Sequence, residues 1–129
     1  MEINVNELTG TVLDWAVAKA VGAYATANGG SEIWGCKIWS VPGFENMRWD
    51  DWTPSTDWAQ GGPLIDLYGL GVVKFYPPVD GPVLPGCEWA ALWIDDSDRR
   101  DGPTALIAAC RCIVAANIGS VVNVPDELL

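Results

Sequence analysis

The chain has 129 residues, the usual size of one domain, so we expect a single domain over residues 1–129. Hydrophobic residues make up 50% of the chain and charged residues 19%, which excludes a disordered protein. Seven Lys and Arg against 17 Asp and Glu give a net charge of -10, and no His is present. This balance excludes direct nucleic-acid binding and an electrostatic membrane anchor, and the lack of His removes the usual catalytic base.

The sequence predicts a cytoplasmic protein without a metal or cofactor. No apolar run approaches the roughly 20 residues of a membrane span, and the acidic start lacks the basic segment of a signal peptide. A zinc site would need all four cysteines, since no His is available, but their spacing forms no CxxC pair. We therefore expect reduced thiols that mostly pack as small hydrophobic groups. These cysteines are Cys36, Cys87, Cys110 and Cys112.

Periodicity predicts two main helices among short strands. Apolar stripes indicate helices over residues 11–21 and 103–117, the second beginning at Pro103, where a missing N–H costs nothing. Strands are expected near residues 3–5, 23–27, 32–40, 72–76, 89–94 and 121–124, with a hairpin turn at Asn28-Gly29-Gly30.

The centre of the chain is predicted to be a long loop. Residues 42–63 are rich in Trp, Gly and Pro, which break helices and strands, and a short helical turn is expected over 64–70. Residues 99–102 are predicted to be a second loop. The fold class is therefore α+β, with two main helices packed on a small, mostly antiparallel sheet and a long central loop.

Several segments of the chain match, in order, those of a known family. They are Glu7–Gly10 leading into Asp14–Lys19, then Ser55–Pro63, Gly102–Arg111 and the tail Val124–Leu128. Together these segments resemble the NinX-like proteins of phages and prophages. The resemblance implies a phage origin, and so the host cytoplasm, and an accessory role during infection. It supplies no biochemical activity and no catalytic residues.

The residues favour a binding protein over an enzyme. A Ser or Cys nucleophile normally needs a nearby base, and the usual one is absent. Acidic groups at Asp50-Asp51 and at residues 95–98 could act alone or hold a metal, but such runs are typical of solvated turns. Gly61-Gly62-Pro63 lacks the Lys that follows in a phosphate-binding loop. We expect no catalytic residues, with a carboxylate enzyme as the open alternative.

The unusual Trp content suggests a binding site. Eight Trp are present, three of them (Trp49, Trp52 and Trp58) in the central loop, where they either bind a ligand or pack the loop onto the sheet. Lys19 and Arg111 are cations within the two predicted helices. If they lie beside the loop hydroxyl groups and the Gly61-Gly62 pair, the site would suit a small anionic, aromatic ligand. The alternative for Arg111 is an internal ion pair, with Asp14 or Asp57. The predicted ligand-binding residues are Trp15, Lys19, Ser55, Thr56, Asp57, Trp58, Gly61, Gly62 and Arg111.

Two functions follow from these features. The first is a non-catalytic binder, or sponge, for a small nucleotide-like ligand such as a host defence signal, a step that rests on analogy with phage biology. The alternative is an acidic interaction module that inhibits or modulates a host nucleic-acid or defence protein by mimicking DNA charge. The apolar content also predicts a homodimer.

Overall fold

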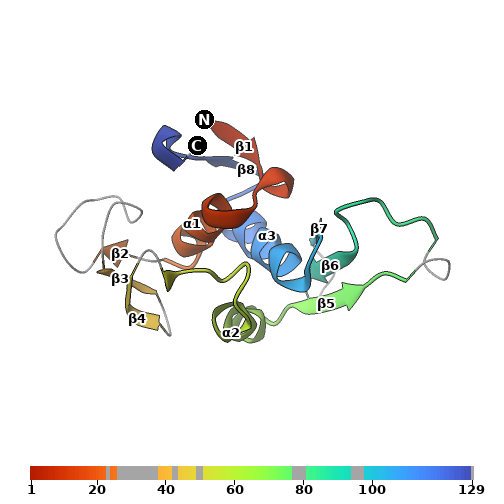
Figure 1. Cartoon of the computed structure of the whole chain (residues 1–129), viewed down its shortest axis with the longest axis horizontal. Helices are drawn as coiled ribbons and strands as arrows, with labels where there is room; N and C mark the ends of the chain where they lie inside the picture. Colours follow the sequence, from red (N-terminus) through yellow and green to blue (C-terminus); the bar gives the residue numbers. More distant parts are fainter. Residues whose placement is uncertain are drawn as a thin grey trace.

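A computed structural model describes residues 1–22, 24–25, 38–41, 44–48, 51–76, 81–93 and 98–128 (Figure 1). The helices are α1 (Gly10–Ala20), α2 (Trp58–Tyr68) and α3 (Ala105–Asn117), with 3-10 turns η1 (Val5–Glu7) and η4 (Asp126–Leu128). The strands are β1 (Glu2–Asn4), β2 (Tyr24–Ala25), β3 (Ile38–Val41), β4 (Phe44–Arg48), β5 (Gly71–Lys74), β6 (Trp89–Leu92), β7 (Arg99–Gly102) and β8 (Val121–Asn123).

Helix α3 is the centre of the molecule. It packs against α1, α2 and all three strands of the β5–β6–β7 sheet, so apolar side chains are buried on several of its faces. Thr104 caps it, its side chain accepting a hydrogen bond from the Ile107 N–H at 3.1 Å. Pro103 therefore precedes the cap and is not the first helical residue. A Cβ on Gly102 would lie 2.8 Å from the Ala108 nitrogen, so this Gly lets β7 lie directly on α3.

The strands form three small antiparallel sheets, which confirms the α+β class. One sheet pairs β1 with β8, so both ends of the described chain lie together at the top of Figure 1. The second has the order β2-β3-β4 and the third β5-β6-β7, on opposite sides of the helices in that view. The predicted turn at Asn28-Gly29-Gly30 lies outside the described residues.

The predicted central loop contains regular structure. β4 and the first half of α2 fall within residues 42–63, so the prediction of an unbroken loop is wrong. Asp57 caps α2 by accepting the Ala59 N–H at 3.0 Å, and Gly69 ends the helix with a φ of 66°. Helix α2 tolerates its Gly pair and Pro63 because it packs against α3, where Gly61 permits close contact.

Residues 99–102 form a strand and not the predicted loop. β7 pairs with β6 in register, Ala90 opposite Asp101 and Ala91 opposite Arg100. The charged sequence of β7 gives no local signal for a strand. β7 lies at the edge of its sheet, and an edge strand accommodates charged side chains because one of its two sides has no partner strand. Among the described residues, no helix is long and apolar enough to cross a membrane.

Candidate functional site

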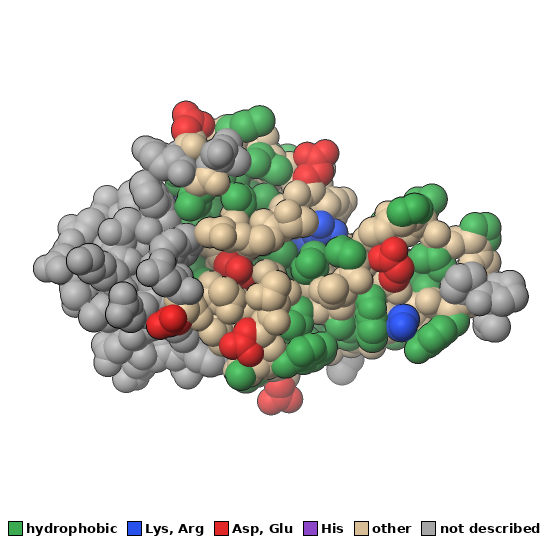
Figure 2. Space-filling model, in the orientation of Figure 1, with side chains coloured by type: hydrophobic (Ala, Val, Ile, Leu, Met, Phe, Trp, Pro, Cys, Tyr) green, Lys and Arg blue, Asp and Glu red, His purple; other side chains and the backbone are tan. Residues whose placement is uncertain are grey.

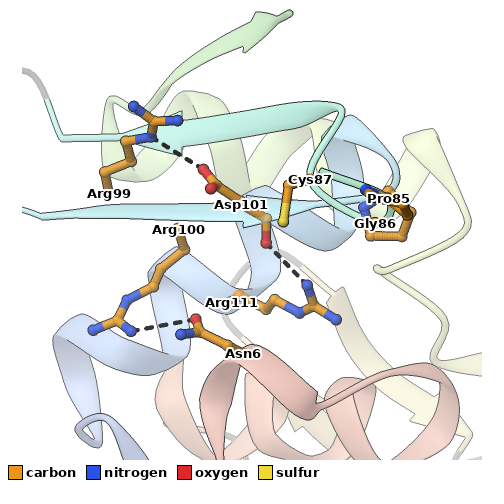
Figure 3. Close-up of a pocket in the computed structure, with 9 residues that line it drawn as sticks. Asn6, Pro85, Gly86, Cys87, Arg99, Arg100, Asp101 and Arg111 are labelled. Atoms are coloured by element: carbon orange, nitrogen blue, oxygen red, sulfur yellow. Dashed lines mark hydrogen bonds and ion pairs between the residues drawn. The ribbon is translucent and has the colours of Figure 1, made fainter. Parts of the chain in front are cut away.

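The main candidate site is a hollow of about 510 Å³ beside β7 and the first turns of α3 (Figure 3). We call it the arginine hollow, because three of the four arginines of the chain line it. On the face shown in Figure 2, acidic side chains are scattered, a few Lys or Arg atoms are visible in the notch beside the β5–β6–β7 sheet, and another basic side chain lies apart from them on the right. The lining residues are Asn6, Pro85, Gly86, Cys87, Arg99, Arg100, Asp101, Pro103 and Arg111.

Arg111 is the buried cation of this hollow. The residue is only 7% exposed, and burial lowers the pKa of its guanidinium. Its Nε donates to the Leu8 carbonyl at 3.1 Å and its Nη1 to the Asp101 carbonyl at 2.9 Å. Within the described part of the chain, Nη2 has no hydrogen-bond partner and the guanidinium has no carboxylate partner. Arg111 is thus a buried positive charge whose hydrogen bonds among the described residues go to backbone carbonyls.

The other two arginines of the hollow have counterions. Arg99 Nε lies 3.0 Å from Asp101 Oδ1, and Arg100 Nε lies 3.4 Å from Asp98 Oδ1. Arg100 also reaches Asn6 Oδ1 from Nη1, at 3.3 Å, which fixes its position over η1 (Figure 3). The net positive charge of the hollow therefore comes from Arg111.

Lys19 lies in the last turn of α1, and Trp15 lies about one turn before it, in the middle of the helix. They line a separate hollow of about 350 Å³ beside β8, in which Lys19 Nζ is 5.1 Å from the centre of the Trp15 ring. Arg111 instead contacts Leu8, just before α1 begins. An 11-residue helix is about 16 Å long, so the two cations are separated by most of its length. The prediction that Lys19 and Arg111 converge in one concavity is wrong.

The central-loop residues build a packing contact, which we call the α1–α2 junction (Asp14, Trp52, Ser55 and Gly61). The buried Asp14 carboxylate accepts the Ser55 N–H at 2.9 Å, and the Asp14 carbonyl accepts the Trp52 Nε1–H at 2.8 Å. A Cβ on Gly61 would meet the Pro54 carbonyl oxygen and lie 2.6 Å from Leu106 Cδ2. The Gly61 position is therefore filled by neighbouring atoms of the protein and not left open for a ligand.

The remaining predicted loop residues also have local roles or face solvent. Thr56 is exposed and bonds the Thr53 carbonyl, Asp57 caps α2, and Trp58 is 60% exposed at the first turn of that helix. Gly62 is half-buried, with its nearest neighbour outside the backbone being the Trp58 ring. None of the six predicted residues from Ser55 to Gly62 lines the arginine hollow or the hollow beside β8.

The ion pair considered for Arg111 does not form. Asp14 binds Ser55, and Asp57 binds the first turn of α2. Burial raises the pKa of Asp14, and hydrogen bonds from Ser55 partly oppose that rise. The carboxylate is therefore buried and accepts the Ser55 N–H, and it forms no ion pair within the described part of the chain.

Of the nine lining residues, the sequence predicted only Arg111; the other eight are Asn6, Pro85, Gly86, Cys87, Arg99, Arg100, Asp101 and Pro103. One signal was present: in a chain with seven cations, two adjacent arginines end one residue before the Gly102–Arg111 segment. Reading residues 99–102 as a loop hid the register that places Asp101 beside α3.

The thiols differ sharply in surroundings. Cys110 and Cys112 are buried in α3, and burial raises both pKa values, that of Cys112 to about 12. Cys87 is half-buried in the wall of the arginine hollow. No group of three acidic or thiol side chains suited to a metal ion occurs among the described residues, which do not include Cys36.

The comparisons with known proteins support the resemblance drawn from the sequence. No curated protein matches the chain. The family model described as "Bacteriophage P22, NinX" matches residues 4–117, which include α1, α2, α3 and every residue that lines the arginine hollow. The chain therefore belongs to this NinX family of phage proteins.

Proposed function

We propose that this phage accessory protein is a non-catalytic binder of a small anionic, nucleotide-like ligand, held in the arginine hollow. The observation that carries the proposal is Arg111, a buried guanidinium without a carboxylate partner in the described part of the chain. Buried charges in proteins are normally paired. A bound anion would supply the missing counterion.

The rest of the hollow supports a phosphate-sized group. Arginine presents a fork of donors suited to phosphate or carboxylate oxygens, and Nη2 of Arg111 is available for such a contact. Arg100 and Asn6 extend the polar wall on one side. The volume of about 510 Å³ lies within the range of small-molecule sites.

The rest of the surface makes this location distinctive. The net charge of -10 repels anions at long range, so a small anion needs a local positive field to bind. Three of the seven cations lie in this one hollow. We infer that the acidic exterior selects against nucleic acid, while the hollow admits a small anion.

The test uses inorganic phosphate and pyrophosphate with the full chain, measured by calorimetry and thermal shift. A ligand at 100 times its dissociation constant adds roughly 2.7 kcal/mol to the unfolding free energy. Arg111→Lys keeps the charge but loses the fork, so we expect binding to weaken about tenfold or more. Lys19→Gln removes one positive charge at the other end of α1 and should leave the affinity unchanged.

A second pair of variants keeps the test valid if Arg111→Lys folds poorly. Cys87 lines the hollow, and a negative charge on its thiol would raise the pKa of Arg111, against the larger effect of burial. Cys87→Asp should stabilise the fold by pairing Arg111 and should abolish anion binding. Cys87→Asn has the same shape without the charge and should retain binding.

Two results would contradict the proposal. The first is that neither phosphate nor pyrophosphate binds the unmodified protein at millimolar concentration. The second is that Cys87→Asp and Cys87→Asn bind equally well. Either result would favour the acidic interaction module, which a pull-down from host lysate addresses.

Light scattering of the same samples tests the predicted homodimer, which a single-chain mass at micromolar concentration would contradict.

A further inference from the structure

A second hollow adjoins the arginine hollow. Its volume is about 200 Å³, and three side chains, Cys87, Arg99 and Asp101, belong to the walls of both. The two spaces are therefore neighbours on either side of the Arg99–Asp101 ion pair. The remaining walls of the second hollow are Phe75, Pro82, Val83 and Leu84.

The second hollow differs chemically from the first. Four apolar side chains form one part of its wall, and the Arg99–Asp101 pair forms the polar part. The Arg99 guanidinium lies 4.8 Å from the centre of the Phe75 ring, so it already stacks on an aromatic face. Its side chain remains 54% exposed, which leaves area for a second flat group.

The walls are held by short-range hydrogen bonds. The Cys87 N–H donates to the Leu84 carbonyl at 3.0 Å, and the Gly86 N–H donates to Glu88 Oε1 at 3.0 Å. The Phe75 N–H donates to the Glu88 carbonyl at 2.9 Å, which ties this turn to the end of β5. Leu84 is nevertheless 70% exposed, a large apolar side chain at the rim of the hollow with little covering it.

We propose that the second hollow is a ring-binding subsite for the same ligand whose anionic group binds at Arg111. The ligand class is then a nucleoside monophosphate or a molecule of the same design, with a phosphate joined through a short linker to a flat heteroaromatic ring. The apolar walls and the Arg99 guanidinium contact the ring faces, and the polar part of the wall faces the ring edge. This assignment rests on the proposed function.

Two probes separate the subsite from the anion site. Ribose 5-phosphate carries the sugar and phosphate alone, and adenosine 5′-monophosphate adds the ring. If the ring is bound, the nucleotide should bind about tenfold more tightly than the sugar phosphate, the scale of base stacking. Calorimetry on the full chain gives both affinities under one set of conditions.

Two exposed leucines provide a matched pair of variants. Leu84→Ser removes the rim of the second hollow, and Leu67→Ser removes an equally large side chain that is 63% exposed on α2. We expect Leu84→Ser to weaken nucleotide binding at least about fivefold and to leave the sugar phosphate unchanged. Leu67→Ser should change neither affinity, and both variants should melt near the unmodified protein.

The outcomes distinguish the two proposals. If neither probe binds, the proposed function fails. If ribose 5-phosphate binds and the nucleotide binds no better, the anion site stands and the ring subsite is overturned. Equal effects of Leu84→Ser and Leu67→Ser would also overturn the subsite.

Discussion

The α1–α2 junction and the arginine hollow each contain a buried charged side chain, but the two side chains differ in how completely the protein supplies their partners. At the junction, the Asp14 carboxylate meets a buried N–H and Gly61 is covered by neighbouring atoms. In the hollow, Arg111 is equally buried but one of its nitrogens is without a partner among the described residues. At the junction, the Asp14 carboxylate has a hydrogen-bond donor from the protein. In the hollow, the Arg111 guanidinium has no carboxylate counterion among the described residues.

This difference shows that a buried charge without a counterion indicates a candidate site better than the residue types found in a Gly/Pro-rich segment do. Trp, Ser and Gly in a Gly/Pro-rich segment suggested a binding loop, but the fold uses them to attach α2 to α1 and α3. Arg111, the buried charge without a carboxylate partner among the described residues, lies where β7 passes over the start of α3. Changes at the junction should therefore alter stability, and changes in the hollow should alter ligand affinity.

The largest effect expected at the junction comes from Gly61→Ala. The new Cβ would contact the Pro54 carbonyl oxygen, which cannot move without shifting the backbone. We expect a loss of about 2–3 kcal/mol in unfolding free energy, measured by urea denaturation, with phosphate affinity unchanged in the folded fraction.

Gly62→Ala is the matched control for that change. Its Cβ would lie 3.7 Å from Trp58 Cε3, an ordinary contact, so the better helix propensity of Ala should raise stability by about 0.5–1 kcal/mol. If the two variants had equal stability, the close packing of α2 on α3 would be disproved.

A smaller effect is a pH dependence at Asp14. Burial raises its pKa above the ordinary value of 3.8, so the folded chain holds this proton more tightly than the unfolded chain. The contribution of this group to stability is thus fully present below pH 3.8. It is lost as the pH rises through the pKa of Asp14 in the folded chain, which is higher than 3.8. Asp14→Asn keeps an acceptor for Ser55 but does not titrate.

We expect the stability difference between Asp14→Asn and the unmodified protein to move in favour of the variant as the pH rises from acid to neutral. Chemical denaturation at a series of pH values measures this difference. A difference that stays constant with pH would show that the hydrogen bonds from Ser55 cancel the effect of burial, and one that moves the other way would show that they outweigh it.

The smallest effect is expected for Lys19→Gln. Lys19 is exposed and its charge contacts the Trp15 ring at 5.1 Å, an interaction of about 0.5 kcal/mol at a surface site. Thermal denaturation should therefore show a decrease of about 2 °C in the melting temperature. A loss comparable to that of Gly61→Ala would mean that this end of α1 is as constrained as the junction.

Local sequence signals were sufficient to predict helices α1 and α3. The apolar stripe over residues 11–21 and the entry at Pro103-Thr104 predicted α1 and α3 within two residues at each end. Only a short helical turn over residues 64–70 was predicted where α2 lies. The first half of α2 was missed because Gly61, Gly62 and Pro63 each disfavour a helix, and packing on α3 overrides that local preference.

The site could be predicted only in part. Arg111 was identified because a cation inside an apolar helix needs an explanation. Its true neighbours depend on the pairing of β7 with β6 and on η1, which meets α3 across about a hundred residues of sequence. Lys19 was grouped with Arg111 because both are helical cations, although nothing in the sequence gives the distance between two helices.

The bond from Arg111 to Leu8 joins residues 103 positions apart, and β1 pairs with β8 across a similar span. During synthesis, α1 leaves the ribosome long before α3, the helix against which its apolar face packs. Its buried Leu13 and Val17 must therefore stay exposed or find temporary contacts until most of the chain has been made. Contacts of such long range also slow folding, so we expect the arginine hollow to form late on the folding pathway.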